Sequence, residues 1–403
     1  MAARRQQDRD RLPVVETELA RLELQISRLR IERSGIKRRL ESYIYPVQNL
    51  PNEIVSEIFI NLIPPYPECP PLFGQQSPTR LLRICHAWRE IALHTPQLWR
   101  AIDCQGPPPR YRLRPNQTVP DAATTLAEIN TWLGRSASCG LSLSFDPQPD
   151  ENPEYQTDVM KLLRLHQHRW EFLTMTSVAA VESNETPLAL AGPLPLLREL
   201  WAFHSVAVSA APSNAPMLRS LFLSIPRFPD TFAMGPNNIQ WAQFTSLNLN
   251  HAIEDCLPIL RDAVNLRHFY VHLEREKTIL PAALHLPPRL ETFILVFDAN
   301  PGSLPLAPGY LQKIVGPALK RVHIHAVFLQ PNPMDVINAF LRNSQCPLQH
   351  LQFMGQSKPF VILAEELRVL LPHIPKITKV SGPPEPVIGQ SMDQYFDRIT
   401  LPY

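Results

Sequence analysis

The feature that most constrains the fold of this chain is an internal repeat in its second half. A short unit recurs there, in which one apolar residue is followed by two variable residues, an apolar residue, one variable residue and a third apolar residue. The units start at Trp170, Leu197, Leu218, Phe244, Leu266, Leu290, Leu319 and Leu348, with a ninth fragment at Ile377. Starts that lie 21 to 29 residues apart predict stacked units, each of which buries one face against its neighbour.

The repeat resembles the leucine-rich repeat family, and this resemblance implies an α/β solenoid with parallel strands. Within each unit the second and third apolar residues are two positions apart, so on a strand both point into the core between repeats. A proline introduces several units: Pro195, Pro216, Pro288, Pro317 and Pro347. The regular asparagine or cysteine that many members of the family carry later in the unit is missing. We therefore expect an irregular solenoid.

The residues between the paired apolar positions are expected on the opposite, concave face of the sheet. Aromatic and histidine side chains are frequent there, and exposed aromatic residues in a row are typical of a protein-binding surface. We predict target binding by Trp201, Phe203, Phe222, Tyr270, His272, His323 and His325. The alternative is that a further layer, such as the C-terminal tail or the proline-rich loops, covers this face.

A second informative stretch, Asn49 to Ile102, is rich in apolar residues at helical spacing. Pro51 suits the first position of a helix, and Glu53 lies where the helix dipole favours a carboxylate. Thr79 is expected to cap a second helix that carries Trp88. Short amphipathic helices do not enclose this much apolar surface by themselves. The stretch therefore favours a docking module that a partner covers in part.

Three blocks of this stretch resemble the F-box of fungal, basidiomycete-type F-box proteins. They read Leu50-Pro51-x-Glu53-Ile54-x-x-x-Ile58-Phe59, Cys85-x-x-Trp88-Arg89-x-Ile91-Ala92 and Thr95-Pro96-x-Leu98-Trp99. The resemblance implies docking to the Skp adaptor of a Skp-cullin-F-box ubiquitin ligase. It assigns adaptor binding to Leu50, Pro51, Glu53, Ile54, Ile58, Phe59, Leu62, Cys85, Trp88, Ile91, Leu98 and Trp99. The alternative is a small helical core whose tryptophans pack inside.

Residues 63–78 form a proline-rich insertion between the helices of this module. The insertion is longer than a tight connection, so we expect it to change the loop next to the adaptor.

The region before the module carries a heptad pattern. Its seam positions are Val15, Leu19, Leu22, Ile26, Leu29, Arg33, Ile36, Leu40 and Tyr43, spaced alternately by four and three residues, and only the arginine breaks the apolar series. This spacing predicts a coiled-coil helix. It leaves two interpretations open, a homodimer or a helix that folds back on the rest of the chain. The basic excess of this region is typical of a solvated helix face.

Composition narrows the class of protein. The formal net charge is +2 for 403 residues, so no strong overall field favours nucleic acid or a membrane surface. The six cysteines form no C-x-x-C pair, and no apolar run is long enough for a membrane span. We therefore expect an intracellular protein, cytoplasmic or nuclear. Proline is frequent, at 44 residues, and is expected to punctuate short elements.

The sequence offers no recognisable catalytic site. It has no phosphate-binding glycine loop, no H-E-x-x-H and no G-x-S-x-G. His323 and His325 share a strand face with His272 nearby, but no carboxylate or cysteine completes a metal set. Cys85 and His86 are adjacent on a helix and point in different directions. We expect a protein without enzymatic activity, cofactor or metal.

These observations together predict the organisation of the chain. We expect a disordered basic start at 1–13, a coiled-coil helix at 14–45, the F-box-like module at 46–102, a linker and capping region at 103–165, the repeat domain at 166–382 and a tail at 383–403. Such a chain would be the substrate-recognition subunit of a Skp-cullin-F-box ligase. A leucine-rich-repeat scaffold outside ubiquitin ligases is the alternative function.

Overall fold

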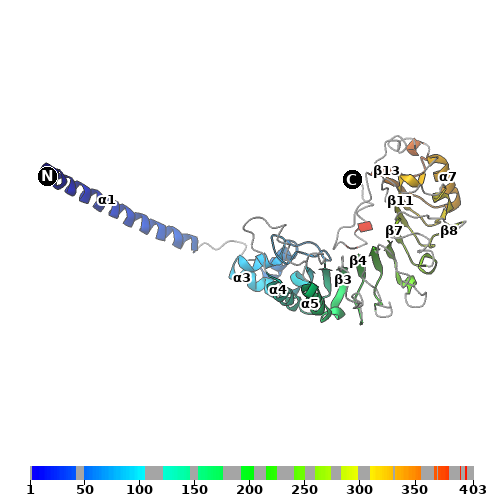
Figure 1. The fold of residues 1–403 in the computed structure, drawn as a ribbon, viewed down its shortest axis with the longest axis horizontal. Helices are drawn as coiled ribbons and strands as arrows, with labels where there is room; N and C mark the ends of the chain where they lie inside the picture. The colour runs from blue at the N-terminus through cyan, green and yellow to red at the C-terminus, as the bar shows by residue number, and fades with distance from the viewer. Residues whose placement is uncertain are drawn as a thin grey trace. The chain divides into compact units, whose positions relative to one another are not determined.

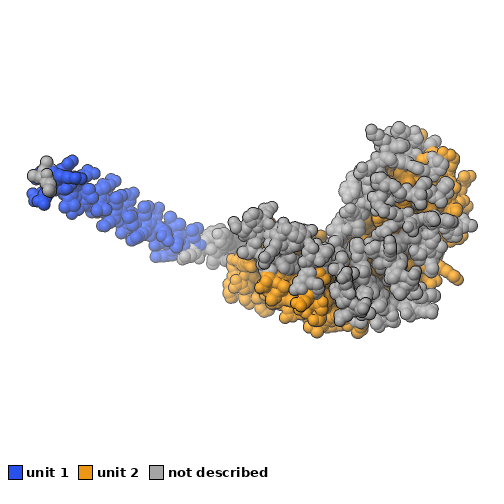
Figure 2. Space-filling model, viewed as in Figure 1, with its two compact units in different colours: residues 1–55 blue, residues 56–403 orange. Residues whose placement is uncertain are grey.

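The computed structural model describes residues 2–41, 50–104, 121–145, 153–175, 192–203, 215–224, 240–249, 259–273, 283–297, 309–329, 332–354, 367–369, 371–380, 391 and 395–396. The chain divides into two compact units, residues 1–55 and residues 56–403, coloured separately in Figure 2. The boundary between the units falls inside helix α2 (Asn52–Ile60).

The first unit is dominated by one long helix, α1 (Ala2–Glu41). The helix begins at Ala2 and passes through Pro13, so residues 2–13 of the expected disordered start are helical. The apolar seam positions that fall within α1 are all exposed, from Val15 to Leu40. Tyr43, the last predicted seam residue, lies outside the described residues.

The second unit is built on a parallel sheet of 11 strands, drawn as a curved row of arrows in Figure 1. Nine of its strands belong to the repeat region and follow the predicted units: β3 (Trp170–Met175), β4 (Glu199–Phe203), β5 (Ser220–Ser224), β6 (Ser246–Leu249), β7 (His268–Leu273), β9 (Thr292–Phe297), β11 (Arg321–His325), β12 (His350–Met354) and β13 (Lys376–Val380). The predicted leucine-rich-repeat-like α/β architecture is confirmed.

Two further strands extend the sheet before the first predicted unit. β2 (Leu141–Phe145) is the strand expected in the capping region, and β1 (Ala101–Asp103) pairs with it at the edge. All neighbouring strands pair in parallel, in the order β1-β2-β3-β4-β5-β6-β7-β9-β11-β12-β13. A small separate sheet joins β8 (Leu284–His285) to β10 (Ile314–Val315).

Each repeat buries its paired apolar residues between strand and outer layer. Leu200, Leu247 and Phe293 are examples, each at most 1% exposed. The outer layer is made of short connections, including the 3-10 helices η7 (Trp241–Gln243), η8 (Leu311–Lys313) and η9 (Ala326–Leu329). Three longer helices contribute as well: α4 (Ala122–Arg135), α5 (Pro153–Arg164) and α7 (Pro333–Ser344). Figure 1 shows α5 and α7 on the outer side of the curved sheet.

The F-box-like stretch folds as short helices, although not with the predicted boundaries. After α2 come the 3-10 helix η2 (Pro78–Arg83), α3 (His86–Leu93) and the 3-10 helix η3 (Pro96–Trp99). The expected cap, Thr79, lies inside η2, and the hydroxyl of Ser77 accepts its backbone N–H instead. Cys85 is in extended conformation and caps α3, so one predicted helix is divided into two.

The proline-rich insertion packs on the first strands of the sheet. Tyr66 donates a hydrogen bond to Glu171 at 2.6 Å, and the Ser142 hydroxyl donates to the Pro67 carbonyl oxygen at 2.5 Å. The backbone N–H of Asp103 donates to the Pro70 carbonyl oxygen at 3.0 Å. The insertion thus ties the helical module to β1, β2 and β3.

The Tyr66 ring is held on several sides. It makes an edge contact with Phe172, with 5.4 Å between the ring centroids. The Arg100 guanidinium lies over the Tyr66 ring, 3.7 Å from the ring centroid. Gly140 leaves room for Glu171, the hydrogen-bond partner of Tyr66, because a Cβ atom at position 140 would collide with the Glu171 side chain. Burial and the Glu171 carboxylate raise the pKa of Tyr66 above its usual range, so its hydroxyl stays a donor.

Among the residues that the structure describes, no helix is both long enough and apolar enough to span a membrane.

Candidate functional site

The concave face of the sheet is formed by rows of side chains from successive strands. The backbone register sets the middle row, which runs through Asp103, Ser144, Thr174, Trp201, Phe222, Asn248, Tyr270, Ile294, His323, Gln352 and Thr378. This row contains four of the seven residues predicted to bind a target. These four residues thus lie on the same face of the sheet, opposite to the paired apolar residues of the repeats.

The expected exposure of these residues requires a correction. Trp201 is 1% exposed, and Phe222, Tyr270 and His323 are likewise buried. His272 and His325 are half-buried, and the side chain of Phe203 lies outside the described residues. Among the described residues, the concave face therefore offers no open row of aromatic side chains.

Two residues near the C-terminus cover the aromatic part of this face. Tyr395 and Phe396 are buried in one apolar cluster with Trp201, Phe222, Tyr270, Ile294, Val296 and Met354. The Phe396 ring stacks on His268 with 4.7 Å between centroids, and the Tyr395 ring meets Tyr270 edge-on at 6.5 Å. This face is thus covered by residues of the C-terminal tail, which agrees with the alternative interpretation of the sequence.

The cluster is ordered by aromatic stacking as well as by burial. Trp201 and Phe222 stack almost parallel, with 4.9 Å between centroids and 7° between planes. The Trp201 indole N–H donates to the buried carboxylate of Glu199 at 2.5 Å. Such pairs contribute about 0.5–1.5 kcal/mol beyond the burial of their area. The cluster is therefore a structural part of the solenoid.

The far end of the concave face holds two buried histidines. Burial is the main reason that the pKa of His323 falls to about 3, and burial together with Lys376 and Arg321 lowers the pKa of His350 to about 4. The two rings are in edge contact at 5.1 Å, and His350 Nε2 bonds to the Thr378 hydroxyl at 2.8 Å. Both histidines are thus neutral at pH 7.

Neither metal binding nor thiol chemistry finds support in the part of the chain that is described. No group of three or more histidine, cysteine, aspartate or glutamate side chains in it is placed to hold a metal ion. Burial raises the pKa of the Cys69 thiol to about 12 and raises that of Cys104 as well. Both thiols are protonated at neutral pH, the form that is a poor nucleophile.

The helical module presents its predicted adaptor-binding residues on two different sides. Phe59, Leu98 and Trp99 are fully buried inside the module, which corrects the expectation that they contact an adaptor directly. Phe59 meets Trp88 edge-on at 5.0 Å, and the Trp99 indole N–H donates to the Ala92 carbonyl oxygen at 2.9 Å. These three side chains hold the module together.

The remaining apolar residues of helix α2 and its flanks are directed outward. Ile54 is 49% exposed, Ile58 is 41% exposed and Leu62 is 61% exposed. Leu50 is also exposed, as are Pro51 and Glu53, whereas Cys85, Trp88 and Ile91 are half-buried. Sequence reasoning missed Ile84, an exposed residue between η2 and α3 that it had placed inside a helix.

Comparison with models of known protein families and with curated proteins finds no match to this chain.

We predict that acid weakens the fold through the buried histidines. Their pKa values in the folded chain lie below the usual value of about 6.5, so below pH 6.5 the unfolded chain binds more protons. Their contribution to stability is complete above pH 6.5 and is lost as the pH falls toward 4. The free energy of unfolding should fall by up to about 1.4 kcal/mol per histidine for each pH unit. Urea unfolding between pH 7 and pH 4 measures it.

The variant His323→Leu should flatten this pH dependence, because it removes one of the two buried histidines. Equal slopes for His323→Leu and the parent chain would contradict the assignment.

We also predict that the C-terminal aromatic pair stabilises the repeat domain. Replacing Tyr395 and Phe396 by alanine removes two buried rings and should lower the free energy of unfolding by about 3–5 kcal/mol for each large cavity left. Urea denaturation measures the loss, with Val369→Ala as a control because Val369 is highly exposed. A double variant as stable as this control would show that the pair is not part of the core.

Proposed function

We propose that the chain is a substrate receptor of a Skp-cullin-F-box ubiquitin ligase. In this function the helical module binds the Skp adaptor, the repeat domain holds the target protein, and other subunits perform ubiquitin transfer. The observation that carries the proposal is helix α2, which has one buried apolar side and a second apolar side that is exposed. The chain would then contribute proximity between target and conjugating enzyme rather than chemistry of its own.

The two sides of α2 have different surroundings. Val55 and Phe59 are buried, and the Ser56 and Thr95 hydroxyls lie 3.0 Å apart. Ile54 and Ile58, four residues apart on the same helix, remain exposed on another side. Fully burying one such side chain contributes about 1.5–3 kcal/mol. A partner that covers Ile54, Ile58 and Leu62 would gain part of this amount for each side chain, against the cost of association.

The packing of the insertion supports a receptor in particular. Ubiquitin transfer by proximity requires a fixed distance between the adaptor and the target. The contacts of Tyr66 with Glu171 and of Pro67 with Ser142 join the helical module to the sheet on which a target would be held. The expectation that residues 63–78 also change the loop next to the adaptor stays a prediction. A scaffold outside ubiquitin ligases has less need for such a rigid joint.

The test is a binding assay between the full chain and a purified Skp adaptor. Ile58→Asp combined with Leu62→Asp should weaken binding at least tenfold, because each change places a charge in the proposed contact. Phe59→Asp is unsuitable because Phe59 belongs to the core of the module. Calorimetry or surface plasmon resonance provides the affinity.

The matched control is Leu165→Asp combined with Val369→Asp, two changes at exposed apolar residues elsewhere. It should bind like the parent chain. Absence of binding by the parent chain, or equal binding by both double variants, would exclude the receptor function. Adaptor binding without cullin in the purified complex would favour the scaffold.

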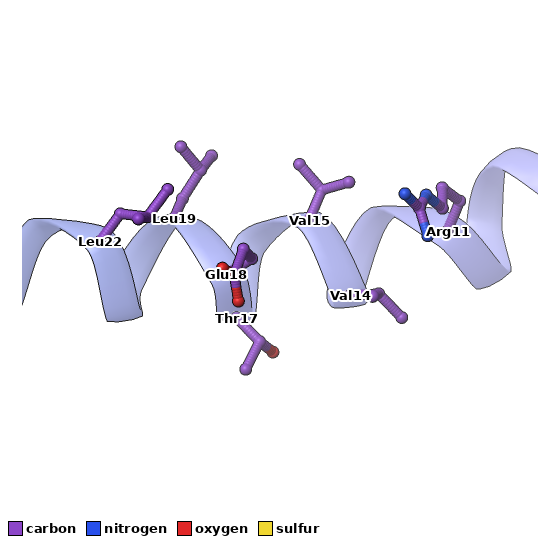
Figure 3. A pocket seen from close by; sticks show the side chains of 7 residues that line it. All are labelled: Arg11, Val14, Val15, Thr17, Glu18, Leu19 and Leu22. Carbon is purple, nitrogen blue, oxygen red and sulfur yellow. The ribbon is translucent and has the colours of Figure 1, made fainter.

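We further propose that α1 pairs with α1 of a second copy of the chain. Figure 3 shows Val15, Leu19 and Leu22 projecting from the same side of the helix, while Val14 and Thr17 project from another side. These three seam residues are between 41% and 53% exposed. A helix of 40 residues with an exposed apolar seam is long enough to form a coiled coil.

Replacing Leu22 and Ile26 by glutamate should convert the dimer to a monomer, because it places charges on the seam. Leu24→Glu combined with Ile31→Glu provides the control, since these exposed residues lie off the seam. Light scattering after size-exclusion chromatography measures the mass. A monomeric parent chain, or an equal mass for both variants, would contradict the dimer.

A further inference from the structure

The edge of the sheet where the strands begin carries one side chain from each of seven successive repeats. These residues are Arg198, Arg219, Thr245, Arg267, Glu291, Lys320 and Gln349. An unbroken series of backbone hydrogen bonds connects them, in which each N–H donates to the carbonyl oxygen of the preceding member at 2.8–2.9 Å. The series brings residues that are up to 151 positions apart in the sequence, from 198 to 349, into one continuous row. We call it the edge row.

The edge row is accessible and predominantly basic. Arg198, Arg219 and Arg267 are exposed, Lys320 is partly exposed, and Arg289 lies exposed beside the row. A groove of about 330 Å³ opens there, lined by Arg267, Arg289, Glu291, Ala318, Lys320 and Pro347. Unlike the concave face, this edge is not covered by Tyr395 and Phe396, which pack against Trp201, Phe222 and Tyr270. It is therefore available to a partner.

The internal carboxylates neutralise only part of this charge. Lys320 pairs with Glu291 at 3.1 Å, and Arg198 lies 3.9 Å from Glu171. The Arg219 guanidinium donates to the carbonyl oxygens of Pro216 and Leu218, which carry no formal charge. Arg267 has no ion pair within the described residues. Within the described residues, Arg219 and Arg267 are thus not paired with a carboxylate.

The strand order gives the cations a regular spacing. Arg219, Arg267 and Lys320 precede β5, β7 and β11, which are separated in turn by β6 and by β9. Neighbouring strands lie about 4.8 Å apart, so these three cations recur about every 9.6 Å. A polyproline II peptide has three residues per turn and rises about 3.1 Å per residue, so side chains at every third position face one side about 9.3 Å apart. The two spacings agree closely.

We propose that the edge row binds an extended acidic segment of a protein, with an anionic side chain at every third position. The anions can be carboxylates or phosphates, since both pair with guanidinium groups. This proposal rests on the proposed function in one respect: the bound protein is taken to be the target for ubiquitin transfer. The segment lies along the edge and crosses β5 to β11.

The two glutamates of the region favour a peptide over a nucleic acid. A nucleic-acid strand brings a phosphate with every nucleotide, and some of these phosphates would meet Glu171 or Glu291. A peptide with one anion in three residues can place neutral residues opposite these carboxylates. A peptide whose anions are spaced three residues apart thus fits the alternation of cations and carboxylates along the edge row.

The test uses the full chain and three fluorescent peptides of ten residues. One has glutamate at every third position among prolines and alanines, the second has phosphoserine at the same positions, and the third has glutamine there. Fluorescence anisotropy at low salt should show binding of the first or second peptide at least tenfold tighter than binding of the third. The stronger of the two anionic peptides identifies the preferred anion.

The variant Arg219→Glu combined with Arg267→Glu should weaken that binding at least tenfold. The control with the same change in net charge is Arg83→Glu combined with Arg342→Glu, at exposed positions away from the row, and it should change the affinity less than twofold. Equal effects of the two double variants, or equal binding of all three peptides, would overturn the proposal. Tighter binding of a single-stranded RNA of equal charge would overturn it as well.

These outcomes are separable from those of the receptor function. Adaptor binding depends on α2, and peptide binding depends on the edge row, so each assay can fail while the other succeeds. Circular dichroism of both double variants establishes whether the fold is retained. A misfolded row variant is replaced by Arg219→Gln with Arg267→Gln, which should weaken anionic binding in the same direction.

Discussion

The parallel hydrogen-bond ladder between repeats is the constraint on which the second unit depends. A single repeat is too short to bury its paired apolar residues, and it gains a core only when the next repeat pairs with it in the same register. The register from β4 to β5, for example, sets Leu200 beside Leu221 and at the same time Trp201 beside Phe222. One backbone pattern therefore determines the core, the concave face and the edge of the sheet together.

The repeat architecture was accessible from the sequence because two apolar residues at a spacing of two recur in every unit. The pattern placed the strands and assigned Trp201, Tyr270 and His323 to the concave side of the sheet. It could not show that this side is covered. The periodicity of a strand tells which way a side chain points, whereas the cover comes from Tyr395 and Phe396, distant in sequence and without any repeat. Burial of these aromatics is a long-range property.

The helical module shows a similar limit. Apolar spacing identified α2 but did not distinguish Phe59, which is buried, from its neighbour Ile58, which is exposed. That choice depends on packing against Trp88, which follows the insertion. The expected continuous helix from Thr79 ends early because Cys85 adopts an extended backbone, with φ of −155°, and begins a new helix. Local propensity alone does not predict such a break.

The contacts of the insertion also determine where the chain can be divided. A boundary after Ile102, suggested by the end of the F-box-like pattern, cuts through β1 and separates Tyr66 and Pro67 from their partners on β2 and β3. A fragment that ends there loses the hydrogen bond that Tyr66 donates to Glu171 and the one that Ser142 donates to Pro67, and it separates β1 from its partner strand β2. A fragment that keeps these contacts of Tyr66 and Pro67 would need to extend at least to Met175, the end of β3.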